Sequence, residues 1–231
     1  MSKNQFRVEY QPHICLRTGK IGGFEALVRW EHPTSGRRCP NEFIPIAEET
    51  GLILPLGYWV LKTACRQQKE WQATLPNPPA IISVNLSVKQ LIQPDVAQRV
   101  AEILQQVDLA PHHLRLEITE GVLIENLKDV MGRLNQLSAL GIQLAIDDFG
   151  TGYSSLARLR TFNFDVLKID RLFVREISSI EAKTAIIKAI IELGHSLNIR
   201  INAEGIEYEH QLTTLKALGC DEGQGFFLPG R

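Results

Sequence analysis

Short apolar runs alternate along the chain with longer amphipathic segments, and the two patterns predict different elements. The short runs predict eight strands, at Phe6–Gln11, Gly23–Trp30, Ile81–Leu86, Leu114–Thr119, Gln143–Asp148, Val166–Asp170, Arg200–Ala203 and Gly225–Leu228. Apolar residues three or four positions apart predict helices at Val96–Val107, Leu127–Leu140, Lys183–Leu197 and His210–Leu218. The alternation of strand and helix predicts a parallel sheet. Eight strands in 231 residues favour an α/β fold of the (β/α)8 type.

The first two predicted strands depart from this alternation. Only eleven residues separate Phe6–Gln11 from Gly23–Trp30, and they contain the turn sequence Thr18-Gly19-Lys20. This length is too short for a helical crossover but sufficient for a hairpin. We therefore expect an irregular TIM-like barrel whose first strand runs antiparallel to its neighbour. Because no linker or repeat divides the chain, residues 1–231 are expected to form a single domain.

Composition excludes several classes of protein. The 25 lysine and arginine residues balance 26 aspartate and glutamate residues, whereas DNA, RNA and membrane surfaces are bound through a basic excess. No apolar run approaches the roughly 18 residues of a membrane span, and the polar N-terminus is not a signal peptide. The four cysteines are far apart and form no CxxC pair, which argues against a disulfide framework or a thiolate zinc site. We therefore expect a cytoplasmic protein with no membrane segment and no nucleic-acid polymer as partner.

Polar side chains interrupt the predicted strands close to their C-terminal ends, where barrel enzymes carry their active sites. They are Glu25, Asn85, Glu117, Asp147, Asp148, Lys168, Glu204 and Gln224. Any one of these acids could be a salt-bridge partner, but five in one barrel mouth would repel each other unless cations compensate them. With Lys168 offsetting one charge, two divalent cations would neutralise the cluster. All-oxygen ligands select Mg²⁺ or Mn²⁺, and such an ion pair suits phosphodiester hydrolysis.

Other catalytic motifs are weak or absent. The sequence Gly150-Thr151-Gly152 after a predicted strand resembles a dinucleotide-binding turn, but it lacks the third glycine and follows two acids that would repel a pyrophosphate. The chain has no phosphate-binding GxxxxGK[ST] motif, no HExxH pair and no GxSxG nucleophile turn. The acidic strand ends therefore remain the strongest chemical signal.

Seven short motifs at these strand ends together resemble the EAL domain family. They are Glu25-Ala26-Leu27 followed by Arg29, Asn85-Leu86-Ser87, Glu117-Ile118-Thr119-Glu120, the run DDFGTGYSSL at Asp147–Leu156, Lys168-Ile169-Asp170, Ala203-Glu204-Gly205-Ile206-Glu207 and Gln224-Gly225-Phe226. The resemblance runs from about Phe6 to the C-terminus. It implies a hydrolase of bacterial second-messenger signalling. Such enzymes open cyclic di-GMP to linear pGpG by attack of a water, activated by two metal ions, on one phosphodiester.

The resemblance also implies a metal site and its ligands. One ion would be held by Glu25, Asn85, Glu117 and Asp147, and the second by Asp147, Asp148 and Glu204, so that Asp147 bridges the two. The expected cofactors are two divalent cations, Mg²⁺ or Mn²⁺. Ca²⁺, whose bonds to oxygen are longer and whose coordination is looser, is expected to bind and to inhibit.

Further roles follow from the same resemblance. The catalytic residues would be Lys168, Glu204 and Gln224, and the substrate contacts Gln11, Leu27 and Arg29, with Arg29 holding a phosphate. Glu120 would anchor the loop that begins at Asp147, which in the family couples the site to a dimer interface. The implied partners are therefore cyclic di-GMP and a second copy of the chain. Sensory or diguanylate cyclase modules would accompany it in the full-length protein, from which this chain would be an excised domain.

The chain departs from the family pattern at a few positions. The family usually has an aliphatic residue in place of Asn202 and often threonine in place of Tyr208, and the chain ends at Arg231, before the usual proline-containing tail. None of these positions is a predicted metal ligand. Asn202 should face the barrel interior, as Glu204 does, and should hydrogen-bond to an interior polar group or an ordered water.

Two alternative functions remain open at this point. The first is a non-catalytic cyclic di-GMP receptor, although binding alone does not require two metal ions and the acids are all present. The second is an unrelated barrel enzyme that acts on a different phosphodiester, which only substrate profiling excludes.

Overall fold

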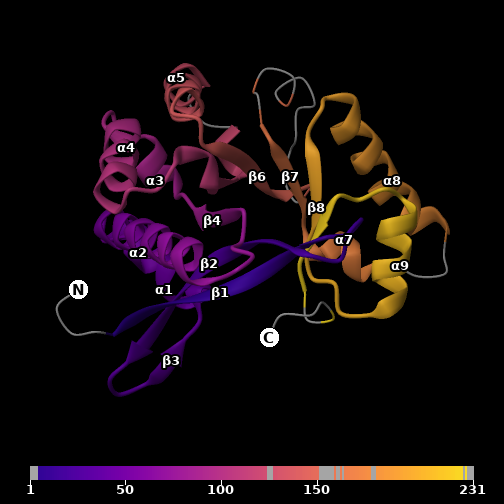
Figure 1. Ribbon diagram of the computed structural model, residues 1–231, viewed down its shortest axis with the longest axis horizontal. Helices are drawn as coiled ribbons and strands as arrows, with labels where there is room; N and C mark the ends of the chain where they lie inside the picture. The colour runs from indigo at the N-terminus through magenta and orange to yellow at the C-terminus, as the bar shows by residue number, and fades with distance from the viewer. Residues whose placement is uncertain are drawn as a thin grey trace. The chain divides into compact units, whose positions relative to one another are not determined.

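The computed structural model describes residues 5–123, 127–150, 159, 162, 164–177, 181–225 and 227 (Figure 1). Its strands are β1 (Phe6–Cys15), β2 (Ile21–His32), β3 (Gly36–Arg38), β4 (Ile81–Asn85), β5 (Leu114–Thr119), β6 (Gln143–Phe149), β7 (Val166–Ile169), β8 (Arg200–Ala203) and β9 (Glu222–Gly223). Its α-helices are α1 (Pro40–Glu49), α2 (Ile53–Thr74), α3 (Val88–Leu91), α4 (Val96–Val107), α5 (Leu127–Ala139), α7 (Arg171–Arg175), α8 (Glu181–Ser196) and α9 (Glu209–Ala217). Two 3-10 helices are η1 (Pro111–His113) and η2 (Glu120–Leu123).

The strands are hydrogen-bonded in the order β1-β9-β8-β7-β6-β5-β4-β2-β3, and β1 also pairs with β2. This second pairing closes a ring of eight strands, to which β3 is added at β2. Strands β6 to β9 run parallel, whereas β1 pairs antiparallel with β9. The predicted irregular TIM-like barrel, with an antiparallel first strand, is therefore confirmed.

The last predicted strand, Gly225–Leu228, is wrong. The final strand is β9, at Glu222–Gly223, and neither Gly225 nor Phe227 belongs to a strand, while residues 226 and 228 lie outside the described residues. After β9 the chain passes close to the backbone of Ile206, which accepts a hydrogen bond from Phe227 N at 3.0 Å. This close passage ends the regular pairing with β8. Strands β1 and β2 are also longer than predicted.

The chain divides into two compact units. The first comprises Met1–Gln11, Phe24–Leu116 and Lys128–Ile142, and the second Pro12–Gly23, Glu117–Leu127 and Gln143–Arg231. Among the described residues, no helix has the length and apolar character that crossing a membrane requires.

Aromatic side chains cover one face of β1 and β2 in the first unit. Phe6 stacks on Trp30 at a ring-centroid distance of 5.7 Å and also contacts Trp59 of α2. Farther along, Tyr10 and Phe24 both pack on Trp71 of α2. All the residues that β1 and β2 contribute here have even numbers. Because side chains of a strand alternate between its two faces, the odd-numbered residues of these strands lie on the opposite face.

Helix α8 packs against β8 in the second unit. A Cβ atom on Gly194 of α8 would lie 2.2 Å from Ile201 Cδ1, so the glycine leaves room for the Ile201 side chain directly against the helix. Ile201 therefore faces the helix, and its neighbour Asn202 faces the other way, which confirms the predicted inward register. Asn202 is fully buried, and neither of its amide atoms has a hydrogen-bond partner among the described residues, so no described protein group is the predicted partner. The alternative partner, an ordered water, stays a prediction.

Candidate active site

Lys168 is the centre of an acidic cluster in the second unit. Its side chain is 1% exposed, and its Nζ contacts the carboxylates of Glu117, Glu204 (2.7 Å) and Asp147 (3.3 Å). These residues come from β5, β6, β7 and the residue after β8, four strands that are consecutive in the sheet. An ammonium group offers only three donors, so three carboxylates match its capacity. The structure thus brings together four of the residues singled out at strand ends.

Two further acids add negative charge next to this cluster. Asp148 follows Asp147 with a left-handed φ of 56°, and its backbone N donates to Asp147 Oδ1 at 3.0 Å. Burial, the Asp147 carboxylate and a hydrogen bond with Asp170 raise the pKa of Asp148 to about 6, although the charge of Lys168 opposes this shift. Asp170 also accepts a hydrogen bond from Leu172 N at 2.7 Å and so caps α7. The negative charge exceeds what one ammonium compensates.

Backbone hydrogen bonds hold Glu204 and Gln224 at the C-terminal ends of β8 and β9. Glu204 N donates to Ile169 O of β7 at 3.1 Å, and Gln224 N donates to Ala203 O of β8 at 2.9 Å. Ile206 N returns a hydrogen bond to Gln224 O at 3.0 Å. Both side chains follow directly from strands that run parallel, so they lie at the same edge of the sheet.

Glu120 holds the start of the loop after β6. It is 3% exposed, and its Oε2 accepts a hydrogen bond from Gly150 N at 2.9 Å. Gly150 has a φ of 94°, and a Cβ there would lie 2.7 Å from the ring of Phe173. The anchoring of the whole loop by Glu120 stays a prediction. Residues 151–156 of that loop lie outside the described residues.

The first unit contains the other predicted ligands. Glu25 of β2 is buried, and its Oε1 accepts a hydrogen bond from Asn85 Nδ2 at 2.8 Å, at the end of β4. Glu25, Leu27 and Arg29 are alternate residues of β2, on the face opposite the aromatic cluster. Gln11 of β1 has the same parity and shares that face. Arg29 is bound by its Nε to Glu9 Oε2 (2.9 Å) and by its Nη1 to Val28 O (3.0 Å).

The acidic cluster has the chemistry of a divalent-cation site but not its geometry. No group of three or more His, Cys, Asp or Glu side chains stands in a metal-binding arrangement within the described part of the chain. The Lys168 ammonium lies between the carboxylates instead. The atoms that could bind a metal ion are nevertheless all oxygens, and the negative charge of the carboxylates exceeds the positive charge of Lys168. Such donors fit a hard cation such as Mg²⁺ or Mn²⁺.

Two residues that contact the predicted set had no predicted role. Asp170, quoted above only as the last residue of a motif, follows β7 directly and shares a hydrogen bond with Asp148, and its position at a strand end was a usable signal. Glu9 contacts Arg29, but nothing in the sequence marks a lone acid in β1 as its partner.

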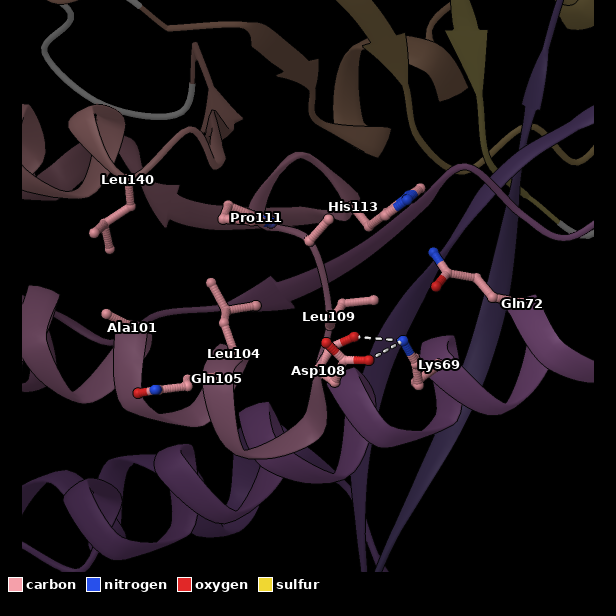
Figure 2. Close-up of a pocket in the computed structure, with 11 residues that line it drawn as sticks. Lys69, Gln72, Ala101, Leu104, Gln105, Asp108, Leu109, Pro111, His113 and Leu140 are labelled. Atoms are coloured by element: carbon pink, nitrogen blue, oxygen red, sulfur yellow. Dashed lines mark hydrogen bonds and ion pairs between the residues drawn. The ribbon is translucent and has the colours of Figure 1, made fainter.

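A separate cavity of about 520 Å³ opens in the first unit between α2 and α4 (Figure 2). Lys69 and Asp108 form an ion pair of 2.8 Å at its edge, and Leu104, Leu109 and Leu140 supply apolar lining. It borders η1, just before β5 begins, whereas the candidate residues follow the ends of strands. None of the predicted site residues lines this cavity.

The sequence matches a family model and several curated relatives over almost its whole length. Residues 1–229 match the family model described as the EAL domain. MucR of Pseudomonas aeruginosa, a bifunctional diguanylate cyclase/cyclic di-GMP phosphodiesterase, is 43% identical over 230 residues, which are 99% of this chain and 33% of MucR. The chain spans about a third, or less, of the curated relatives it matches first.

Two solved structures have the same fold. The structure of the PaMucR phosphodiesterase in complex with c-di-GMP is 43% identical, has a TM-score of 0.93, and is matched over 99% of this chain and 92% of that one. The EAL enzyme Bd1971, in a form with bound cAMP and cyclic-di-GMP, is 33% identical, with a TM-score of 0.93 and coverage of 98% and 62%.

Proposed function

Because the chain belongs to the EAL domain family, we propose that it is a phosphodiesterase that hydrolyses cyclic di-GMP to linear pGpG. The observation that carries this proposal is the cluster of Glu117, Asp147 and Glu204 around Lys168 at the ends of consecutive strands. MucR, whose name states a cyclic di-GMP phosphodiesterase activity, and the PaMucR phosphodiesterase complex support the choice of substrate.

Two divalent cations, Mg²⁺ or Mn²⁺, would complete the site. Their ligands would be Glu25, Asn85, Glu117, Asp147, Asp148 and Glu204. When bound, such ions acidify water and polarise a phosphodiester. The surplus of carboxylates over the Lys168 ammonium supports this requirement, because a binding site for an anionic nucleotide must lose its excess negative charge.

The chain's own polar groups would act on the water and on the phosphate. Lys168 would stabilise the negative charge that develops on the phosphate oxygens, because its ammonium is buried and held among neighbouring side chains. Gln224, which is also buried, would orient the attacking water together with Lys168. Glu120 would keep the loop after β6 in place, and with it the start of the acidic cluster.

Substrate binding would use the face of β1 and β2 that lies opposite the aromatic cluster. Arg29 would donate paired hydrogen bonds to a phosphate, while Gln11 and Leu27 would contact the rest of the nucleotide. We infer further that the chain acts as one cytoplasmic module of a longer protein, with sensory or diguanylate cyclase modules, and that it dimerises. The naming of MucR as bifunctional supports the cyclase module.

The proposal is tested by incubating the purified chain with cyclic di-GMP and either Mg²⁺ or Mn²⁺ and separating the products by chromatography. We expect pGpG as the product. Asp147→Asn keeps the size of the side chain but removes its charge, and it should lower kcat by about a hundredfold or more. The matched control is Glu192→Gln, at an exposed residue of α8, which should keep full activity.

The possible outcomes separate the competing functions. Tight binding of cyclic di-GMP without turnover, also in excess chelator, would support a receptor instead. Faster cleavage of another phosphodiester than of cyclic di-GMP would refute the assigned substrate. Retention of most activity in Asp147→Asn would refute the assigned metal site.

A further inference from the structure

Three arginines converge on one carboxylate, that of Glu9 in β1. Arg29 Nε lies 2.9 Å from Glu9 Oε2, and Arg37 Nη2 contacts the same oxygen. Arg7 Nη2 lies 3.2 Å from the other oxygen, Oε1, and 2.9 Å from Glu31. All five residues belong to β1, β2 and β3 of the first unit.

The strand register explains this convergence. Arg7 and Glu9 alternate along β1, and Arg29 and Glu31 alternate along β2, so all four lie on the face opposite the aromatic cluster. Strand β3 pairs antiparallel with β2, with Arg37 opposite Glu31. The same face holds Glu25 and Gln11, which are predicted to bind a metal ion and the substrate. The arginine cluster therefore extends along the candidate binding face.

Of the three arginines that contact Glu9, Arg29 has the most restricted side chain. The Arg29 side chain is 19% exposed, against 48% for Arg37 and 52% for Arg7. Its guanidinium is held by Glu9 at Nε and by Val28 O at Nη1, and neither bond uses Nη2. An arginine in a fixed orientation loses less side-chain entropy when it binds a ligand than one that moves freely. Glu9 thus prepares Arg29 for an anion.

Because Glu9 is charged, the direction in which its removal changes substrate affinity reveals its role. Burial favours the neutral acid, but hydrogen bonds from Arg37 and Arg29 outweigh it and lower the pKa of Glu9, so the group is a carboxylate at neutral pH. A carboxylate next to an anionic substrate repels it, so its removal alone should improve binding. If Glu9 instead acts by orienting Arg29, its removal should weaken binding.

We propose that Glu9 is a positioning residue, which orients the Arg29 guanidinium for a phosphate of the substrate. The inference rests on the proposed function, in which Arg29 binds cyclic di-GMP. The pair of Glu9 and Arg29 would also contribute to substrate specificity, because an oriented guanidinium discriminates between phosphate groups by their direction as well as by their charge.

A double-mutant cycle tests the proposal. The values of kcat and KM for cyclic di-GMP are measured at saturating Mg²⁺ for the wild type, Glu9→Ala, Arg29→Ala and the double variant. Glu9→Ala should raise KM by about five- to twentyfold, with kcat within about twofold. In the Arg29→Ala background the same change should not raise KM. Glu9→Gln, which keeps an acceptor oxygen, should give a smaller rise.

Arg7→Ala is the matched control. It removes an arginine from the other oxygen of Glu9 and should leave KM within about twofold, since Arg29 keeps its own partner. An unchanged or lower KM in Glu9→Ala would overturn the positioning role, and so would an equal rise with and without Arg29. A wild type that neither binds nor cleaves cyclic di-GMP would contradict the proposed function itself. An active wild type with an inert Glu9→Ala change would contradict only the role of Glu9.

Discussion

Replacing Asn202 by valine tests whether a buried amide without partners destabilises the protein. Asn202 is the third residue of β8 and is 0% exposed. It lies beside Lys168 of β7 and Glu222 of β9 in the strand register, yet its Nδ2 and Oδ1 have no hydrogen-bond partner among the residues described. Valine has nearly the same volume and no polar atoms, so the change removes the polarity with little effect on packing.

The expected gain in stability follows from the cost of burying an amide. Mutational data place the penalty for an unsatisfied buried polar group at about 1–3 kcal/mol. Valine also suits a strand better than asparagine, by up to about 1 kcal/mol. We expect Asn202→Val to raise the free energy of unfolding by about 1–3 kcal/mol. For a chain of this length, each kcal/mol corresponds to about 2–4 °C in Tm.

Urea unfolding followed by circular dichroism measures this difference, and a thermal melt checks it. The control is Asn77→Val, at an exposed residue of the loop before β4, which should change stability by less than about 0.5 kcal/mol. A lower urea midpoint for Asn202→Val, with the control unchanged, would refute the reasoning. It would mean that the amide makes hydrogen bonds in the folded protein that are worth more than its burial costs.

Three further predictions concern packing, thiols and the choice of ion. A Cβ on Gly225 would lie 2.2 Å from Ile206 O, so Gly225→Ala should destabilise the protein by about 3 kcal/mol in a thermal melt. The control Gly132→Ala has open space around the new methyl group and should be neutral or stabilising. Burial raises the pKa of Cys65 and of Cys220 to about 12. At pH 8 iodoacetamide should therefore label the exposed Cys39 but neither buried cysteine, as mass spectrometry would show. Rapid labelling of Cys65 or Cys220 would contradict their burial. With Ca²⁺ as the sole divalent ion, calorimetry should detect binding of cyclic di-GMP while pGpG formation falls strongly, and brisk turnover would argue against the assigned site.

Helices with a regular apolar face can be predicted from the sequence, whereas very short strands cannot. Helix α4 begins and ends at the predicted residues, because it buries Val96, Val100, Ile103 and Leu104 on one face. Helices α1 and α2 have no counterpart among the predicted helices. Pro45 interrupts the pattern of α1, whereas α2 buries one regular face from Ile53 to Gln68, a periodicity that the prediction did not use. Strand β9 has only two residues, too few for any periodicity.

The acids of the site were predictable, but their partners were not. A charged residue in an apolar strand is visible without a structure, which is why Glu117, Asp147 and Glu204 could be singled out. The contact of all three with Lys168 depends on the order of the strands in the sheet. The pairing of Glu9 with Arg29 depends in addition on the register between strands. Neither follows from local sequence.

Asn202 in β8 and Glu204, the residue after this strand, are two positions apart. Asn202 is fully buried and the Glu204 side chain is 21% exposed, so both polar groups lose most of their contact with water. Local costs of this kind are expected at functional sites. For Glu204 the contact with Lys168 offsets the cost, whereas Asn202 has no such contact among the described residues. The two positions should therefore respond differently. If Asn202→Val gains stability and keeps kcat, Asn202 lies outside the catalytic machinery; if it gains stability but loses kcat, Asn202 supports its register neighbour Lys168.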